Sequence, residues 1–210
     1  MSLKGVRRMP RTNKDACTVQ IVGVGGQGAL TVSRIIGAAA LKKGLNIIVS
    51  EIHGMAQRGG VVQTTIRLGD AKSPLPFEDD ITVLAGFEPL EVYRARGQIT
   101  EDTVVIISED PILPISVSSG GKPYPDIKTI IEELRKNVKC VHALSAREKA
   151  IEAGNDRATN VVLLGAMIGT QALPFTYEEM RAAIEETLPK RTLEPNLKAY
   201  DLGYKGTHGE

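Results

Sequence analysis

The chain has 210 residues, enough for one domain with a sizeable core, because folding at this length buries roughly 70% of the surface that the unfolded chain exposes. Its 26 basic and 25 acidic side chains leave a formal net charge of +1, so no overall electrostatic attraction favours a nucleic acid or an anionic membrane as partner. Hydrophobic residues make up 42%, which argues against disorder, and aromatic residues only 4%, which leaves few side chains for stacking bases.

The first half of the chain predicts a strand, a glycine loop, a helix and a second strand. Residues 1–16 are basic without periodic apolar positions, and we expect a flexible tail there, followed by a single domain over 17–210. The β-branched run Cys17–Gly23 predicts a buried strand, 28–43 a helix, and 46–50 a second strand. This order is typical of a βαβ unit, so we expect two parallel strands joined by a right-handed crossover.

Strands and helices continue to alternate after this unit. Further strands are expected over 61–68, 81–85, 104–107 and 138–141, and helices over 88–96, 126–137, 158–172 and 176–188. The alternating run 61–68 is expected to be antiparallel at or near an edge, and the proline-rich stretch 111–125 to be irregular. The pattern predicts a three-layer, Rossmann-like α/β domain with a mainly parallel, mixed sheet and a helical C-terminal part.

The longest apolar run is too short for a membrane-spanning helix. It extends from Val161 to Gly169, far short of the ~20 residues that span a bilayer, and the N-terminal segment has no apolar stretch of the kind found in signal peptides. We therefore expect a cytoplasmic protein with neither a membrane nor a nucleic acid as partner.

Cysteine and histidine are too sparse to predict a metal centre. The two cysteines, Cys17 and Cys140, are far apart, and the histidines show no metal-binding spacing. We interpret both cysteines as small buried hydrophobic residues in or beside strands.

The first loop carries the pattern G-x-G-x-x-G, formed by Gly23, Gly25 and Gly28. It follows a strand and opens a helix, and Glu51 lies about where a ribose-binding acid would be found in a dinucleotide-binding protein. Its glycines could let backbone amides approach a phosphate at the positive end of the helix. They could equally serve only a tight turn and close packing of helix on sheet.

A second motif, SEIHGMAQRGG, follows the second strand, at the edge of the sheet where α/β proteins build their sites. A dinucleotide-binding dehydrogenase has nothing so polar and glycine-rich there. Arg58, beside Gly59 and Gly60, suits an anion or the close approach of a partner backbone. Alternatively, Arg58 and His53 hold the loop together through internal hydrogen bonds.

These motifs, with NVVLLGA (160–166) and EPNLKAYDLGY (194–204), resemble the beta subunits of indolepyruvate ferredoxin oxidoreductases. That family is related to the gamma subunits of pyruvate and other 2-oxoacid:ferredoxin oxidoreductases. The likeness covers residues 18–204, in order and with plausible spacing, and SEIHGMAQRGG is its most specific part.

The resemblance implies a subunit of an enzyme that decarboxylates aryl 2-oxoacids, passes electrons to ferredoxin and forms an acyl-coenzyme A. Thiamine diphosphate, Mg²⁺ and [4Fe-4S] clusters are then held by a large alpha subunit, and coenzyme A is a co-substrate of the complex. This chain has neither a diphosphate-binding GDG motif nor a cysteine cluster. We expect no metal, no resident cofactor and no catalytic residue in it, an αβ or α2β2 assembly, and an inactive isolated chain.

The resemblance also suggests roles for two sets of residues. The first set would contact a phosphate of the cofactor or a partner loop: Gly23, Gly25, Gly26, Gln27 and Gly28. The second set would face the partner or a ligand: Glu51, His53, Gln57, Arg58, Gly59 and Gly60. The alternatives are a gamma subunit of a pyruvate-type enzyme, a stand-alone NAD(P)-binding Rossmann protein, and a module that only mediates interactions.

Overall fold

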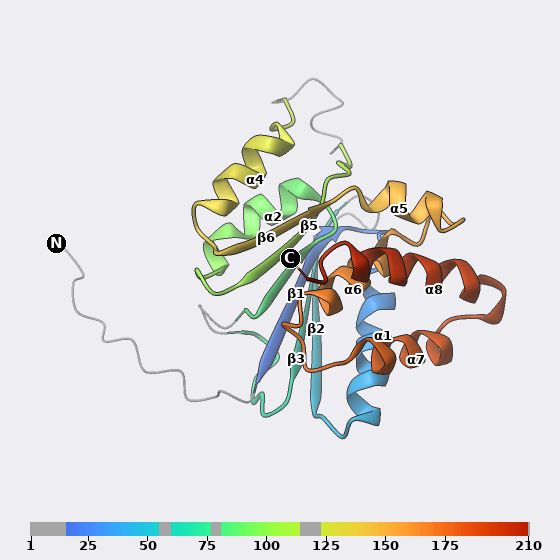
Figure 1. The fold of residues 1–210 in the computed structure, drawn as a ribbon. Coiled ribbons are helices and arrows are strands. Elements are labelled where there is room, and N and C mark those ends of the chain that lie inside the picture. The colour runs from blue at the N-terminus through green and yellow to red at the C-terminus, as the bar shows by residue number, and fades with distance from the viewer. Residues whose placement is uncertain (1–15, 55–59, 77–80, 114–122, 210) are drawn as a thin grey trace.

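The computed structural model describes residues 16–54, 60–76, 81–113 and 123–209, which form a six-stranded sheet between two layers of helices (Figure 1). The strands are β1 (Cys17–Val24), β2 (Ile47–His53), β3 (Val61–Leu68), β4 (Val83–Gly86), β5 (Val104–Ser108) and β6 (Cys140–Leu144). Their order is β2-β3-β1-β4-β5-β6. The neighbours from β1 to β6 are parallel, whereas β3 is antiparallel to both β1 and β2. The expected mixed α/β sheet is confirmed, with 61–68 antiparallel next to an edge strand.

Strands β1 and β2 run in the same direction, as expected, but they are not neighbours, because β3 lies between them. Strands β2 and β3 form a hairpin, in which the Gly54 amide donates to the Val61 carbonyl at 2.8 Å. An antiparallel pair needs only a short connection, so the chain folds back at once rather than placing β2 beside β1. Both β1 and β2 pair antiparallel with β3, so they run in the same direction and end at the same edge.

The helices cover both faces of the sheet (Figure 1). They are α1 (Ala29–Lys42), α2 (Pro89–Ala95), the 3-10 turn η1 (Arg96–Gln98), α4 (Ile127–Arg135), α5 (Ala146–Glu152), α6 (Thr159–Gly169), α7 (Tyr177–Thr187) and α8 (Lys190–Lys205). Helices α2 and α4 pack on one face, and α1 and α5 to α8 on the other, where most of the core lies. None of the described helices combines the length and apolar character needed to cross a membrane.

Helices α1, α2, α4, α6 and α7 were expected from the sequence, whereas α5 and α8 were not. Helix α7 begins with the expected capping box, in which Thr176 and Glu179 exchange side chain-to-backbone hydrogen bonds. Helix α6 is buried from Asn160 onward, as its apolar sequence predicts. Helices α5 and α8 were not predicted individually. Pro195 lies inside α8, and a proline there removes a backbone donor and disfavours a helix, so the sequence of this segment did not indicate one.

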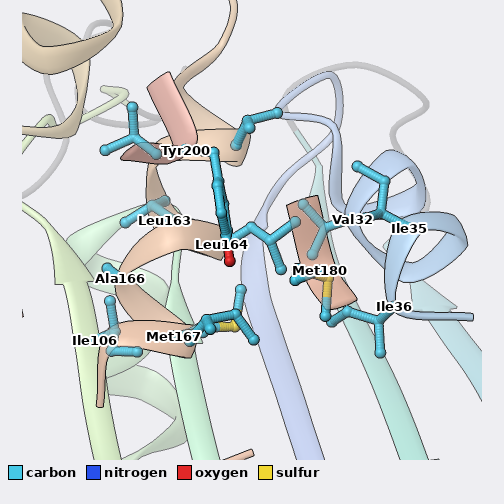
Figure 2. Packing of buried hydrophobic residues seen from close by; sticks show 14 of the residues in the cluster. Val32, Ile35, Ile36, Ile106, Leu163, Leu164, Ala166, Met167, Met180 and Tyr200 are labelled. Carbon is cyan, nitrogen blue, oxygen red and sulfur yellow. The ribbon is translucent and has the colours of Figure 1, made fainter. Parts of the chain in front are cut away.

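Helix α6 lies between the sheet and the other C-terminal helices. Figure 2 shows its side chains packed against β5, α1, α7 and α8: Leu163, Leu164, Ala166 and Met167 lie among Ile106, Val32, Ile35, Ile36, Met180 and Tyr200. The Tyr200 hydroxyl, at the end of a fully buried ring, donates to the Tyr177 carbonyl at 3.0 Å. This hydrogen bond satisfies the one polar group that the ring carries into the core.

Glycines let α6 and α8 cross with their backbones in contact. A Cβ atom added to Gly203 would lie 1.9 Å from the Val162 carbonyl oxygen, and one added to Gly165 would lie 2.1 Å from the Tyr200 carbonyl oxygen. Real Cβ atoms do not approach backbone oxygens so closely, so any other residue would separate the helices. The glycine and small-residue pattern of NVVLLGA and EPNLKAYDLGY is therefore explained by this crossing.

We expect Gly203→Ala to lower the free energy of unfolding by about 3 kcal/mol, because the added methyl group would overpack backbone that cannot move aside. Urea unfolding followed by circular dichroism measures the change. Gly97→Ala is the matched control, since a Cβ atom there meets nothing within 4 Å. Equal stability of the two variants would contradict the close crossing.

Candidate functional site

The glycine loop joins β1 to α1 at the carboxyl edge of the sheet. Gly26 has φ 101° and Gly28 has φ 83°, values in the left-handed region that side chains disfavour. Gly28 also precedes the first turn of α1, where the structure shows no side-chain cap and no acidic residue. The first turn of α1 therefore offers no acidic side chain to the positive end of the helix dipole, which favours an anion or a carbonyl group there.

The Gln27 side chain ties the glycine loop to the end of β4. Its Oε1 accepts a hydrogen bond from the Val24 amide at 2.8 Å, and its Nε2 donates to the Phe87 carbonyl at 2.6 Å. Gly23 makes room for this arrangement, because a Cβ atom there would lie 2.5 Å from Gln27 Oε1. Both ends of the amide are thus used inside the protein, and the side chain positions the loop.

Asn160 fixes the other side of the loop and was not singled out as a site residue by sequence analysis. Its Nδ2 donates to the Gly28 carbonyl at 3.2 Å, and a Cβ atom on Gly28 would lie 2.5 Å from that nitrogen. The available signal was a single amide at the start of an otherwise apolar helix. Through this contact the buried helix α6 supports the loop.

The two sequence motifs meet at one hydrogen bond. The Gly25 amide donates to the Gly60 carbonyl at 2.9 Å, so the end of the second motif lies against the first. Gly54 and Gly60 flank the residues between β2 and β3. The sequence-based assignments of Gln57, Arg58 and Gly59 fall outside the described residues.

Glu51 and His53 lie together on β2, away from the glycine loop. Glu51 accepts from the Thr64 hydroxyl at 3.3 Å, and its other carboxylate oxygen lies 3.1 Å from His53 Nε2. The Glu51 side chain is 18% exposed and that of His53 is 54% exposed, so the histidine presents its ring to solvent.

The position of Glu51 disfavours the NAD(P) interpretation. Through Thr64 it is in register with Ile21 of β1, but β3 separates the two strands. Two strand spacings of about 4.8 Å place the backbone of Glu51 roughly 10 Å from β1. A ribose-binding acid comes instead from a strand beside the one that leads into the glycine loop.

The glycine loop lies where the direction of the helical connections changes. Helix α1, after β1, packs on one face of the sheet, and α2, after β4, packs on the other. Strands β1 and β4 are parallel neighbours, so their carboxyl ends flank a topological switch point, the usual ligand position in open α/β sheets.

A buried carboxylate organises the β4 side of this switch point. Glu88 is 1% exposed and accepts from the Glu91 amide at the start of α2, from the Ile112 amide and from the Tyr124 hydroxyl. Burial first, and then the hydrogen bond to Glu88, raise the pKa of Tyr124, so the phenol remains a donor. Burial likewise raises the pKa of Glu91, partly offset by Arg94. These contacts hold chain segments that follow β4 and β5 together.

We expect Gln27→Glu to lower the free energy of unfolding by about 1–3 kcal/mol, because a carboxylate cannot donate to the Phe87 carbonyl. Chemical denaturation of the isolated chain measures this loss. Gln171→Glu makes the same chemical change at an exposed position and should have little effect. If both variants keep the parent stability, Gln27 does not tie the loop to β4.

Known proteins resemble this chain over nearly its whole length. The family model described as pyruvate ferredoxin/flavodoxin oxidoreductase matches residues 18–206. The Indolepyruvate oxidoreductase subunit IorB of Archaeoglobus fulgidus is 44% identical over 186 residues, 89% of this chain and 92% of its own. The protein of the same name from Methanothermobacter thermautotrophicus is 37% identical, over 89% of this chain and 95% of its own. The 2-oxoglutarate synthase subunit KorC of Methanocaldococcus jannaschii is 28% identical, over 89% and 91%.

A solved structure supports the fold independently. The pyruvate oxidoreductase subunit PORC of Thermotoga maritima superposes with a TM-score of 0.67, over 91% of this chain and 97% of its own. The two sequences are only 21% identical, so this match concerns the arrangement of strands and helices.

Proposed function

Because this chain belongs to the pyruvate ferredoxin/flavodoxin oxidoreductase family, we propose that it is the beta subunit of an indolepyruvate ferredoxin oxidoreductase. The observation that carries the proposal is its greater identity to the IorB subunits than to the 2-oxoglutarate synthase subunit, at similar coverage. A gamma subunit of a pyruvate-type enzyme is the second candidate, favoured by the family match and by the shared fold.

The redox centres of such an enzyme do not fit this chain. A [4Fe-4S] cluster is held by four cysteine thiolates, and the sequence has only two cysteines, Cys17 and Cys140. We therefore place the clusters, thiamine diphosphate and Mg²⁺ on the alpha subunit, where thiamine supplies the decarboxylation chemistry. Ferredoxin is then the electron acceptor of the complex, not a direct partner of this chain.

The contribution of this chain is an edge that completes the partner's active site. We propose that the glycine loop, with Gly60 against it, lies on the coenzyme A side of that site. Two left-handed glycines, the uncapped start of α1 and the switch point between β1 and β4 support this placement. Gln27 and Asn160 would hold the loop in shape, so that its backbone meets an anionic group or a partner loop without rearrangement.

Reconstitution with the alpha subunit tests the proposal. The chain is co-expressed with the large reading frame of the same genome that carries thiamine diphosphate and ferredoxin-type cysteine motifs. We expect the two to co-purify and to reduce ferredoxin or methyl viologen only when indolepyruvate and coenzyme A are both present. Preference for pyruvate would select the second candidate, and failure to co-purify would overturn both.

We expect His53→Ala to weaken assembly with the alpha subunit at least about tenfold while changing the stability of the isolated chain by less than about 1 kcal/mol. The reason is that the His53 ring is half exposed, so it can contact a partner, and its pair with Glu51 lies near the surface, where such a pair adds little stability. Light scattering of the mixed subunits and thermal melting of the chain alone measure the two effects. Lys72→Ala, which removes an exposed lysine paired with Asp70, is the control.

A loss of stability without a loss of assembly would instead make His53 an internal support of the β2–β3 hairpin.

A further inference from the structure

A cysteine and a histidine lie side by side at the far end of the sheet from the glycine loop. The Cys140 Sγ atom is 3.1 Å from His142 Nε2. The two residues are two positions apart on the edge strand β6, so their side chains lie on the same face. Leu144, next in this alternation, belongs to the core that includes α6, so the pair faces the C-terminal helices.

This pair opens into a cavity of about 230 Å³ where the ends of α6 and α8 come together. The cavity walls include Thr170 and Gln171 after α6 and Thr207 and His208 after α8, in addition to the pair itself. Cys140 and His142 are both partly buried, and both line the cavity. At about 30 Å³ for each water in the liquid, the space is large enough for a small organic group.

The other cysteine of the chain has a different neighbour. Cys17 Sγ lies 4.0 Å from the Ala172 carbonyl oxygen, which can accept a hydrogen bond from the thiol but cannot act as its base. An imidazole nitrogen can instead take that proton and leave a thiolate, the nucleophilic form of cysteine. The two cysteines, similarly buried, therefore differ in the chemistry of the adjacent group.

We propose that Cys140 is a reactive thiol, activated by His142, that undergoes exchange with small disulfides in this cavity. His142 takes the thiol proton, and the Cys140 sulfur attacks one sulfur of the disulfide. The disulfide S–S bond breaks, and the departing thiolate receives the proton from the imidazolium. The products are a mixed disulfide on Cys140 and one released thiol, so the exchange needs no further oxidant. The site is independent of the proposed function, because it needs no residue of the glycine loop or of a partner.

The test uses the full-length reduced chain and the probe disulfide 5,5′-dithiobis(2-nitrobenzoate), whose released thiol is coloured. Cys17→Ser leaves Cys140 as the only reacting group, and Cys140→Ser leaves Cys17. We expect the folded Cys17→Ser variant, which keeps Cys140, to react at least about tenfold faster than the folded Cys140→Ser variant. This difference should be lost after denaturation in guanidinium. Equal or slower reaction of Cys140 in the native chain would overturn the proposal.

Variants of the two cavity histidines separate activation from simple access. In the Cys17→Ser background, His142→Phe keeps a ring of similar size but removes the nitrogen, and it should slow the reaction about tenfold. His208→Phe changes the other histidine of the same cavity and should leave the rate within about twofold. His142→Asn replaces His142→Phe if circular dichroism shows the latter to be misfolded. A rate unchanged by the loss of His142 would mean that His142 does not activate Cys140.

Discussion

The contact between the backbones of α6 and α8 determines how the C-terminal half packs on the sheet. Packed helices usually lie 8–10 Å apart, at a distance set by the side chains between them. Here Gly165 and Gly203 remove those side chains at the crossing, and α6 can sink between α8 and the sheet. Once there, its buried first turn brings Asn160 to the Gly28 carbonyl. The close crossing of α6 and α8 thus helps to position the glycine loop of the candidate site through Asn160.

The same glycine loop would have another meaning in another sheet. Its pattern, its place after a strand and its connection to a helix all agree with a dinucleotide-binding protein. The insertion of β3 beside β1 prevents such a site, because it places Glu51 one strand further from the glycine loop. The Glu51 carboxylate contacts Thr64 and His53 instead. A nucleotide site requires the loop and the acid on neighbouring strands, and the hairpin separates them. The function of a glycine loop therefore depends on which strand pairs beside it.

Local patterns predicted most of the elements, and long-range pairing was the part they could not supply. The β-branched run of β1 and the capping box of α7 act within a few residues, so both were visible in the sequence. The position of β3 depends on hydrogen bonds to a strand that lies earlier in the chain, and alternation within 61–68 cannot name that partner. Gln27 was expected to offer its backbone to a ligand, but its side chain proved to be the connection to Phe87. The sequence shows that a polar side chain such as Gln27 can form hydrogen bonds, but its partners are known only from the fold.

The order of the elements along the chain also has a consequence for synthesis on the ribosome. The strands and α1 are made first, yet α6, which covers Ile106 on the sheet face that also carries α1, begins only at Thr159. At roughly 5–20 residues per second, the part of this face that α1 does not cover stays exposed for several seconds until α6 to α8 are made. Apolar surface exposed in this way makes a nascent chain prone to aggregation. The glycine crossing between α6 and α8 therefore forms only after all six strands of the sheet have been made.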